Sequence, residues 1–198
     1  MERRIMAGET RRTKLAPEPL DLVQRFLNTK NLMRGYDLLE SPQRATRWLE
    51  ESGYDPLGTI GGTELARLLG LREGLRDVLL SHNPGASARA AEAASGLNDL
   101  IGTAALGVCF DPSGRPLLAP SSVGTEGFVE DLLGAAVRAS YDGTWRRLKA
   151  CANEGCRSVF YDASKNRSGT WCIMEICGSR AKMRSYRERH SGEPRGAS

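Results

Sequence analysis

The chain has 198 residues, enough for one domain of ordinary size and a small second module, and its 40% hydrophobic and 26% charged residues are typical of a globular protein. It contains no run of roughly eighteen apolar residues, which argues against a membrane-spanning helix, and residues 1–12 lack the apolar stretch of a signal peptide. We therefore expect a cytoplasmic protein in a reducing compartment, where disulfides are rare.

The net charge of +4 is distributed unevenly along the chain. Residues 145–198 contain 12 Lys and Arg against 5 Asp and Glu, a balance of +7, whereas residues 1–144 contain 16 against 19, a balance of −3. The basic C-terminal quarter predicts attraction to a polyanion such as nucleic acid.

Residues 1–17 show no hydrophobic period, and we expect a flexible leader there. Residues 18–144 are interpreted as one mainly helical domain, because apolar residues recur at intervals of three and four. The first predicted helix has this spacing at Leu20, Val23, Phe26 and Leu27. The second begins at Ser41 and Pro42, a capping hydroxyl followed by a proline suited to the first turn, and ends near Gly53.

The next predicted helix is expected to be capped by Thr63 and weakened locally by Gly70 and Gly74. Residues 82–85 predict a turn, in which His82 is expected to be a solvated loop residue. An alanine-rich helix follows, with its apolar stripe at Ala90, Ala94, Leu97 and Ile101.

The period then changes from helical to extended. Two short apolar runs, 107–110 and 116–119, flank a turn with Pro and Gly and predict a β-hairpin, in which Cys109 is expected to be buried. Helical spacing returns over 124–141, and we place the domain boundary after residue 144. No catalytic or phosphate-binding motif occurs in this domain.

Four of the five cysteines lie in the C-terminal module 145–192, with the spacing C-x4-C-x15-C-x4-C. They are Cys151, Cys156, Cys172 and Cys177. Two close pairs joined by a segment long enough for a hairpin can supply the four thiolate ligands of a tetrahedral Zn²⁺ site. Bound Zn²⁺ would bring the charge of the basic segment to about +5 and would supply much of the folding free energy of the module.

Other uses of four cysteines fit this spacing less well. Structural disulfides are disfavoured by the compartment, the clustered spacing of ferredoxins is absent, and no C-x-x-C redox pair occurs. A redox switch, in which oxidation of the thiolates ejects zinc, stays open. An enzyme is the least favoured interpretation, since four cysteine ligands leave no open position on zinc for water.

Within the module, residues 158–161 predict a strand, 162–169 a polar turn and 170–172 a return strand, and a basic helix follows from about Cys177. A knuckle, a hairpin and a helix that bears the last ligand near its first turn make a treble-clef-like zinc finger. We therefore expect a mainly α (α+β) protein, with a disordered tail at 193–198.

Seven basic residues are the candidate nucleic-acid contacts. They are Arg180, Arg184 and Arg187 on one face of the basic helix, Lys182 and Arg189 on the opposite side, and Lys165 and Arg167 on the polar turn. Arginine suits both phosphate and the edge of guanine. The alternative is a solvated basic terminus, with arginines paired to Asp162 or Glu175 and with Arg180 supporting the metal site.

Several segments carry a resemblance to known families. In the module these are CANEGC at 151–156, FYD at 160–162, SKN at 164–166, WC at 171–172 and CGSRAK at 177–182. They resemble the CGNR-type zinc finger family. LDLV at 20–23, LNT at 27–29, DLL at 37–39, SP at 41–42 and LREGLR at 71–76 resemble the ABATE domain that usually precedes this finger. Together the resemblance covers about residues 18–190.

The resemblance implies a stress-responsive transcription regulator, with the four cysteines as zinc ligands, a DNA-binding finger and an N-terminal domain suited to sensing a ligand. Two positions depart from the family pattern. Ser179 stands where the signature has asparagine, and Gly169 and Thr170 stand where a basic pair commonly precedes the Trp-Cys dipeptide. If that pair contacts phosphate in relatives, this protein binds DNA more weakly or through other residues.

The leading hypothesis is therefore a bacterial, zinc-dependent regulator that binds double-stranded DNA, with an N-terminal domain that senses a small-molecule effector or forms a homodimer. The alternative is a protein- or RNA-binding module on the same zinc scaffold. Exposed Trp171, Phe160 or Tyr161 would favour RNA, because unpaired bases stack on aromatic side chains.

Overall fold

The structure, a computed structural model, describes residues 15–86, 90–102 and 104–190. Most of the leader expected at 1–17 and all of the tail expected at 193–198 lie outside these residues. No helix among the described residues is both long enough and apolar enough to span a membrane.

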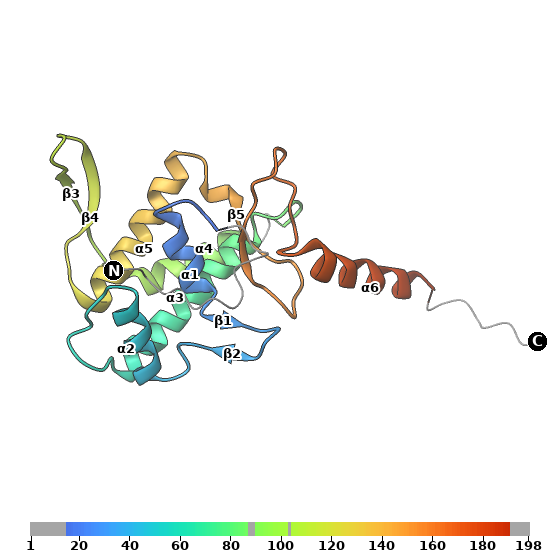
Figure 1. The fold of residues 1–198 in the computed structure, drawn as a ribbon, viewed down its shortest axis with the longest axis horizontal. Helices are drawn as coiled ribbons and strands as arrows, with labels where there is room; N and C mark the ends of the chain where they lie inside the picture. The colour runs from blue at the N-terminus through green and yellow to red at the C-terminus, as the bar shows by residue number, and fades with distance from the viewer. Residues whose placement is uncertain (1–14, 87–89, 103, 191–198) are drawn as a thin grey trace, which may run out of the picture.

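The fold is mainly helical with small antiparallel hairpins, as the sequence predicts (Figure 1). The α-helices of the described chain are α1 (Leu20–Leu27), α2 (Pro42–Glu51), α3 (Gly62–Leu80), α4 (Ala90–Ile101), α5 (Gly124–Tyr141) and α6 (Ser179–His190). The strands pair as β1 (Lys30–Asn31) with β2 (Tyr36–Asp37), β3 (Leu106–Phe110) with β4 (Pro116–Pro120), and β5 (Leu148–Ala150) with β6 (Val159–Tyr161). A 3-10 turn, η2 (Trp145–Arg147), precedes β5, and a π-helical turn, η3 (Met174–Gly178), precedes α6.

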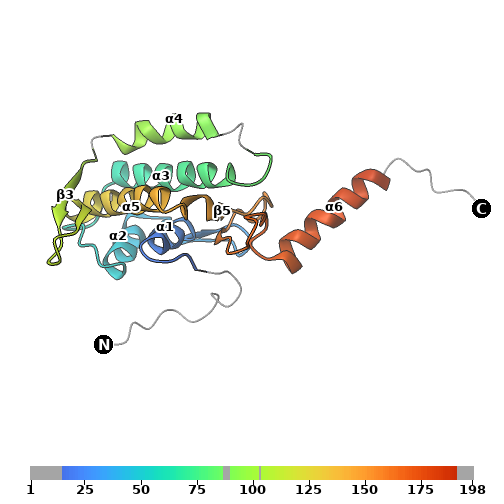
Figure 2. The same ribbon diagram turned by 90° about the horizontal axis from the view of Figure 1, so that it is seen from above.

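The helices of the N-terminal part pack in layers. Figure 2 shows α4 as the outer layer on α3, with α5, α1 and α2 beyond α3. An aromatic cluster fills the centre. The ring of Phe128 contacts those of Phe26, Trp48 and Tyr54, with centroids 5.1 to 5.5 Å apart, and Phe26 and Trp48 also contact each other at 5.8 Å. All four apolar residues predicted for the core face of α1 are buried.

Local signals explain where two of the helices begin. The Ser41 hydroxyl accepts a hydrogen bond from the Arg44 amide, and Pro42 occupies the first turn of α2, as predicted. The prediction that Thr63 caps α3 is wrong. The helix starts earlier, because the Glu64 carboxylate accepts a hydrogen bond from the Gly61 amide at 3.0 Å and satisfies that end of the helix.

Glycines in α3 let α4 approach closely. A Cβ atom at Gly70 would lie 3.0 Å from the Leu100 methyl carbons, and one at Gly74 would lie 3.2 Å from a methyl of Leu97. The apolar face predicted for α4 is only partly right, since Leu97 is buried while Ala94 is exposed. Glycine lowers the stability of α3 itself, but it leaves the space into which Leu97 and Leu100 of α4 pack.

The hairpin of β3 and β4 forms as predicted, with Val108 opposite Leu118 in the register. It extends away from the helical body (Figure 1). Cys109 is consequently exposed, together with Val108 and Phe110, and the prediction of a buried Cys109 is wrong. These side chains are exposed because the tip of the hairpin does not pack on a helix.

The C-terminal segment shares its core with the N-terminal helices. Leu148, Ala150 and Val159 belong to the same buried cluster as the residues of α1, α3 and α5, and β5 packs on α3. The strand predicted at 158–161 is present, but its partner is β5, not 170–172. The segment 170–172 meets the cysteine turn instead, where the Ala152 amide donates to the Thr170 carbonyl at 3.1 Å.

The prediction that His82 is a solvated loop residue is wrong, because its side chain is half-buried. Its Nδ1 is 2.8 Å from the Leu148 carbonyl oxygen of β5, and its ring meets that of Trp145 edge to face at 5.5 Å. Burial lowers the pKa of His82, although the hydrogen bond to Leu148 opposes the shift. The residue therefore joins the end of α3 to the start of the C-terminal segment.

Candidate metal centre and basic surface

The first cysteine pair lies in the turn between β5 and β6. Cys151 directly follows β5, and the Cys156 amide donates to the Asn153 carbonyl at 2.8 Å to close a tight turn. The chain returns through Arg157, whose φ of 51° places a non-glycine residue in the left-handed region. The Cys151 amide then donates to the Ser158 carbonyl at 2.9 Å, which extends the pairing of the two strands.

The second pair lies just before α6. Cys177 belongs to the π-helical turn η3, and its amide donates to the Ile173 carbonyl at 2.9 Å. Gly178 follows, and a Cβ atom there would come within 2.4 Å of the Met174 sulfur and 3.2 Å of the Trp171 ring. A side chain at this position would displace the Met174 side chain and crowd the Trp171 ring, because the turn folds back on its own side chains.

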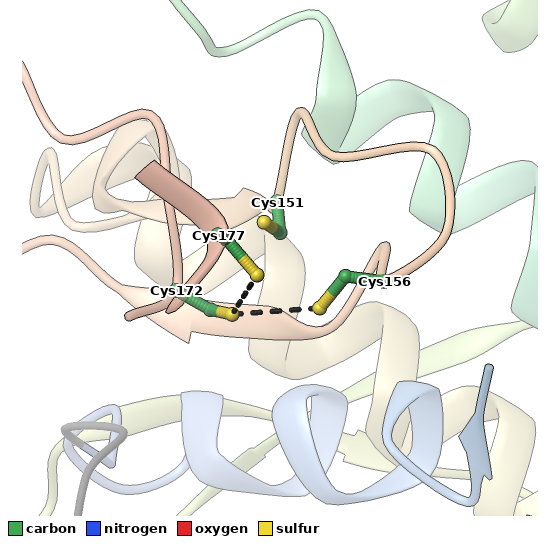
Figure 3. Close-up of side chains that lie close together, drawn as sticks. All are labelled: Cys151, Cys156, Cys172 and Cys177. Carbon is green, nitrogen blue, oxygen red and sulfur yellow. Dashed lines mark hydrogen bonds between the residues drawn. The ribbon is translucent and has the colours of Figure 1, made fainter. Parts of the chain in front are cut away.

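The fold brings the four predicted ligands together (Figure 3). Their sulfur atoms all lie within 4.8 Å of one another, with Cys156 and Cys172 at 3.5 Å and Cys172 and Cys177 at 3.8 Å. A tetrahedron of thiolates around zinc has sulfur atoms about 3.8 Å apart, given Zn–S distances of about 2.3 Å. The donor set and its spacing therefore fit one four-coordinate zinc ion.

Hydrogen bonds within the cluster shift the pKa values of its thiols in opposite directions. Hydrogen bonds with the thiols of Cys151 and Cys172, and with the Ser158 hydroxyl at 3.3 Å, lower the pKa of Cys156 well below its usual range. The pKa of Cys172 is raised, because its thiol hydrogen-bonds to Cys151 and Cys156. Bound zinc would hold all four sulfur atoms as thiolates, and the positive end of the α6 dipole, which lies next to the cluster, favours that negative charge.

A buried ion pair, absent from the sequence predictions, shapes the polar turn at 162–169. The Lys149 ammonium, 1% exposed, donates to the Asp162 carboxylate at 2.9 Å and to the carbonyls of Arg167 and Gly169. Burial raises the pKa of Asp162, but hydrogen bonds from Ser164, Lys149 and Gly169 outweigh it and hold the pKa at about 2. Asp162 is thus paired with Lys149, not with an arginine of the basic helix as the alternative interpretation suggested.

The buried ion pair explains why glycine stands at position 169, where the family pattern commonly has a basic residue. A Cβ atom at Gly169 would lie 2.9 Å from the Asp162 carboxylate, while the Gly169 amide donates to the same carboxylate at 2.7 Å. A lysine or arginine side chain at this position would have to displace the carboxylate.

The seven basic residues are all exposed, on two separate segments. Lys165 and Arg167 lie on the turn that Lys149 holds, where Arg167 has a φ of 51°. The remaining five lie on α6, which projects away from the body in both views (Figures 1 and 2). No residue of α6 is buried, and all of its residues except the half-buried Ala181 are exposed.

Comparison with family models gives two matches. Residues 20–142 match the family described as "ABATE: Putative stress-induced transcription regulator", and residues 147–190 match the "CGNR zinc finger". The comparison with curated proteins gives no match. Because the first match covers more than half of the chain and the cysteine cluster falls within the second, the chain belongs to the ABATE family and has a CGNR zinc finger following its ABATE domain.

Proposed function

We propose that this protein is a zinc-dependent transcription regulator that binds double-stranded DNA through α6 and the turn at 162–169. The observation that carries the proposal is the position of α6: an exposed basic helix begins two residues after the last cysteine of a buried four-sulfur cluster. In this proposal Zn²⁺ has a structural role, since it fixes the direction in which the helix leaves the body. The N-terminal domain would supply effector sensing or dimerisation.

Zinc is the metal that best fits the donor set. Four thiolates at tetrahedral spacing select Zn²⁺ or iron–sulfur chemistry over hard cations, which prefer oxygen ligands. Three of the four cysteines are at most 1% exposed, as in a closed structural site. Such a site leaves no position for a substrate, and this supports a role as scaffold.

The distribution of charge around α6 suits a duplex. Arg180, Arg184 and Arg187 lie on one side of the helix, and Lys182 and Arg189 lie on the opposite side. A helix in the major groove has a phosphate strand on each flank, and each row of cations then meets one strand. A helix that merely lay on a polyanionic surface would need only one such row.

The turn at 162–169 supplies a second contact. Lys165 and Arg167 are exposed on a turn whose backbone is held by the buried Lys149, so little backbone conformational entropy is lost when they meet phosphate.

The aromatic residues give less support to the RNA alternative. Phe160 is 6% exposed, and Trp171 and Tyr161 are partly buried against the two cores. These rings are not presented as platforms for unpaired bases, which the RNA-binding interpretation requires.

The test is binding of the zinc-loaded protein to a random duplex over a salt series, with metal content measured on the same sample. We expect Arg184→Ala with Arg187→Ala to weaken binding roughly tenfold or more and to lower the slope of log K against log salt by about two, since two phosphate contacts are lost.

The matched control is Arg25→Ala with Arg44→Ala, which removes the same charge from exposed positions of the N-terminal domain, where the side chains are 48% and 52% exposed. A chelated sample should bind no better than the double α6 variant. Equal losses in the two double variants would show that only net charge matters, and zinc-loaded protein without duplex affinity at low salt would refute the DNA-binding proposal.

A further inference from the structure

The strand that returns from the first cysteine pair is held by side chains of α1 and its C-terminal cap. The Asn28 amide donates to the Val159 carbonyl at 2.9 Å, and its oxygen accepts from the Val159 amide at 2.8 Å. The Gln24 amide also donates to the Val159 carbonyl, at 3.3 Å. Asn28 therefore pairs with both backbone groups of Val159, in the manner of a neighbouring strand.

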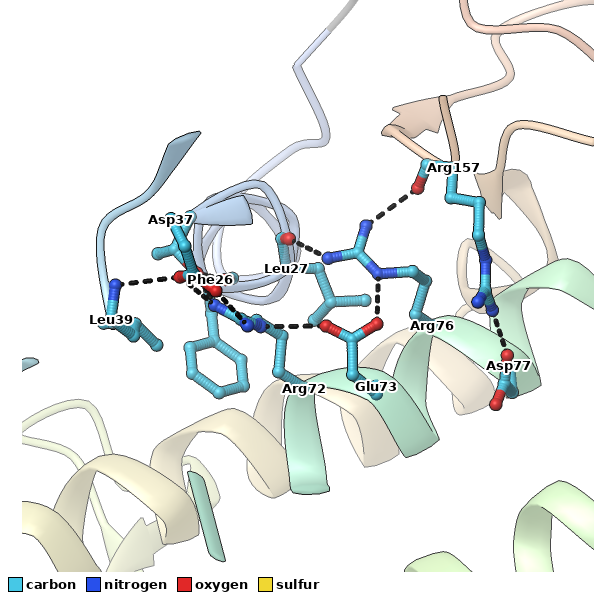
Figure 4. A network of polar contacts seen from close by, with 10 residues as sticks. Phe26, Leu27, Asp37, Leu39, Arg72, Glu73, Arg76, Asp77 and Arg157 are labelled. Atoms are coloured by element: carbon cyan, nitrogen blue, oxygen red, sulfur yellow. Dashed lines mark hydrogen bonds and ion pairs between the residues drawn. The ribbon is translucent and has the colours of Figure 1, made fainter. Parts of the chain in front are cut away.

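A buried guanidinium on α3 reaches the cysteine turn itself. Arg76, 2% exposed, donates to the Arg157 carbonyl at 2.8 Å, to the Leu27 carbonyl at the end of α1 and to the Glu73 carboxylate at 3.1 Å (Figure 4). The Arg157 side chain turns back to form an ion pair with Asp77, also on α3. The residue that follows Cys156 is thus fixed to α3 through its backbone and through its side chain.

Other side chains of the N-terminal part hold the opposite strand and approach the cluster. The Asn83 amide donates to the Ala150 carbonyl at 2.8 Å, directly before Cys151. The Met33 sulfur, on the turn between β1 and β2, lies 4.0 Å from the Cys177 sulfur. The carbonyls of Ala150, Arg157 and Val159 reach these side chains only when the cysteine turn and its two strands have their folded shape.

We infer that the N-terminal domain acts as a template for the metal centre, with Arg76 and Asn28 as positioning residues that hold the cysteine turn in its metal-binding shape. The inference rests on the proposed zinc site. The physical reason is that a buried guanidinium left one acceptor short is costly, and the Arg157 carbonyl completes the set that Leu27 and Glu73 begin, so α1 and α3 favour the turn geometry that supplies it. Because coupling is reciprocal, bound zinc also stabilises the N-terminal domain.

The test measures the dissociation constant for zinc by competition with a chromophoric chelator, in full-length protein at low temperature, with circular dichroism to check that each variant is folded. We expect Arg76→Gln to weaken zinc binding at least roughly tenfold, the scale of one buried charge-assisted hydrogen bond. Asn28→Ala and Asp77→Asn, which disturb half-buried or exposed contacts, should each weaken it several-fold.

Arg72→Gln is the matched control. Arg72 lies one turn earlier on α3, is 1% exposed and shares the Glu73 carboxylate, but its other bonds go to Asp37 and Thr29 and not to the cysteine turn. It should lower the unfolding free energy as Arg76→Gln does, while the zinc dissociation constant stays within about threefold of the wild type, because no bond to the turn is lost.

Hydrogen exchange gives a second measurement that does not depend on a buried substitution. Removing zinc from the wild type should accelerate exchange of amides at the end of α1 and around Arg76, far from the cysteines in sequence. Zinc binding that is equally tight in Arg76→Gln and Arg72→Gln, with unchanged exchange in α1 and α3, would overturn the template role and leave the zinc site intact. A wild type that binds no zinc would overturn both.

Discussion

Lys149 and Asp162 place an ion pair inside the C-terminal segment, where the two residues are 1% and 5% exposed. The three ammonium protons of Lys149 all find acceptors, one on the carboxylate and two on backbone carbonyls of the turn that follows. A pair satisfied in this way fixes a shape, whereas a lone buried charge would destabilise the fold.

We expect Lys149→Met to lower the unfolding free energy by about 3 kcal/mol or more, because Asp162 is left buried without its cation. Urea unfolding of the zinc-loaded protein measures this. Lys165→Met is the matched control, since the same change at an exposed lysine of the turn should cost less than about 0.5 kcal/mol. Similar losses in both variants would contradict the assigned role of Lys149.

His82 gives the fold a dependence on pH. Burial lowers its pKa from the ordinary 6.5, so near that pH the unfolded chain takes up a proton more readily than the folded protein does. Stability linked to His82 is therefore constant above about pH 6.5 and declines as the pH falls below it.

The check is the unfolding free energy of the wild type and of His82→Gln at about pH 7.5 and about pH 5.5. The wild type should lose more stability between the two values than the variant, because glutamine binds no proton. Zinc release in acid affects both proteins alike, so it cancels in the comparison. A wild type and variant with equal losses would mean that His82 takes up its proton equally well in the folded state.

At the scale of elements, α6 depends on its first turn. An isolated helix of about twelve residues is marginal in water, and no residue of α6 is buried against another element. Its start is set by the π-helical turn that contains Cys177, so the metal site acts as the nucleus for the helix.

We therefore expect chelation of zinc to reduce the helical circular dichroism by an amount close to that of α6. A chain that ends at Gly178 is the control, because it keeps the four cysteines but has no α6 to lose. If chelation removes the same helical signal from both chains, the lost helicity lies in the N-terminal domain.

Elements with local signals could be predicted from the sequence, and those that depend on tertiary contacts could not. The start of α2 at Ser41 and Pro42 was predicted because both residues act within one turn. Strand β5 was missed because it has three residues, all buried, and its middle residue is a lysine. The metal cluster was found because the cysteine spacing is local, whereas nothing in the sequence joins Arg76 to the turn that it holds.

At the scale of the molecule, the boundary expected after residue 144 does not divide the core. Leu148, Ala150 and Val159 are fully buried among residues of the N-terminal helices. The segment that matches the zinc finger therefore presents its apolar side to the ABATE domain.

A fragment of residues 145–198 should consequently fold poorly even with zinc, because those three side chains would face water. We expect its amides in β5 and β6 to exchange much faster than in the full-length protein under the same zinc concentration. Leu148→Ser with Val159→Ser in the fragment should improve its solubility, whereas the same changes in the full chain should destabilise it by several kcal/mol, on the order of two buried aliphatic side chains. A fragment as well protected as the full chain would show that the finger is independent.

The joint between α6 and the cluster also has a mechanical consequence. The helix is about 18 Å long, at about 1.5 Å for each residue, and it leaves the body from one end only. A tilt of about 10° at the cluster moves its far end by about 3 Å, close to the rise of one base pair along a DNA strand. The direction of α6 is therefore set at the four sulfur atoms. Arg76 and Asn28 hold the cysteine turn at that point, so a small displacement there becomes the largest displacement at the far end of the helix.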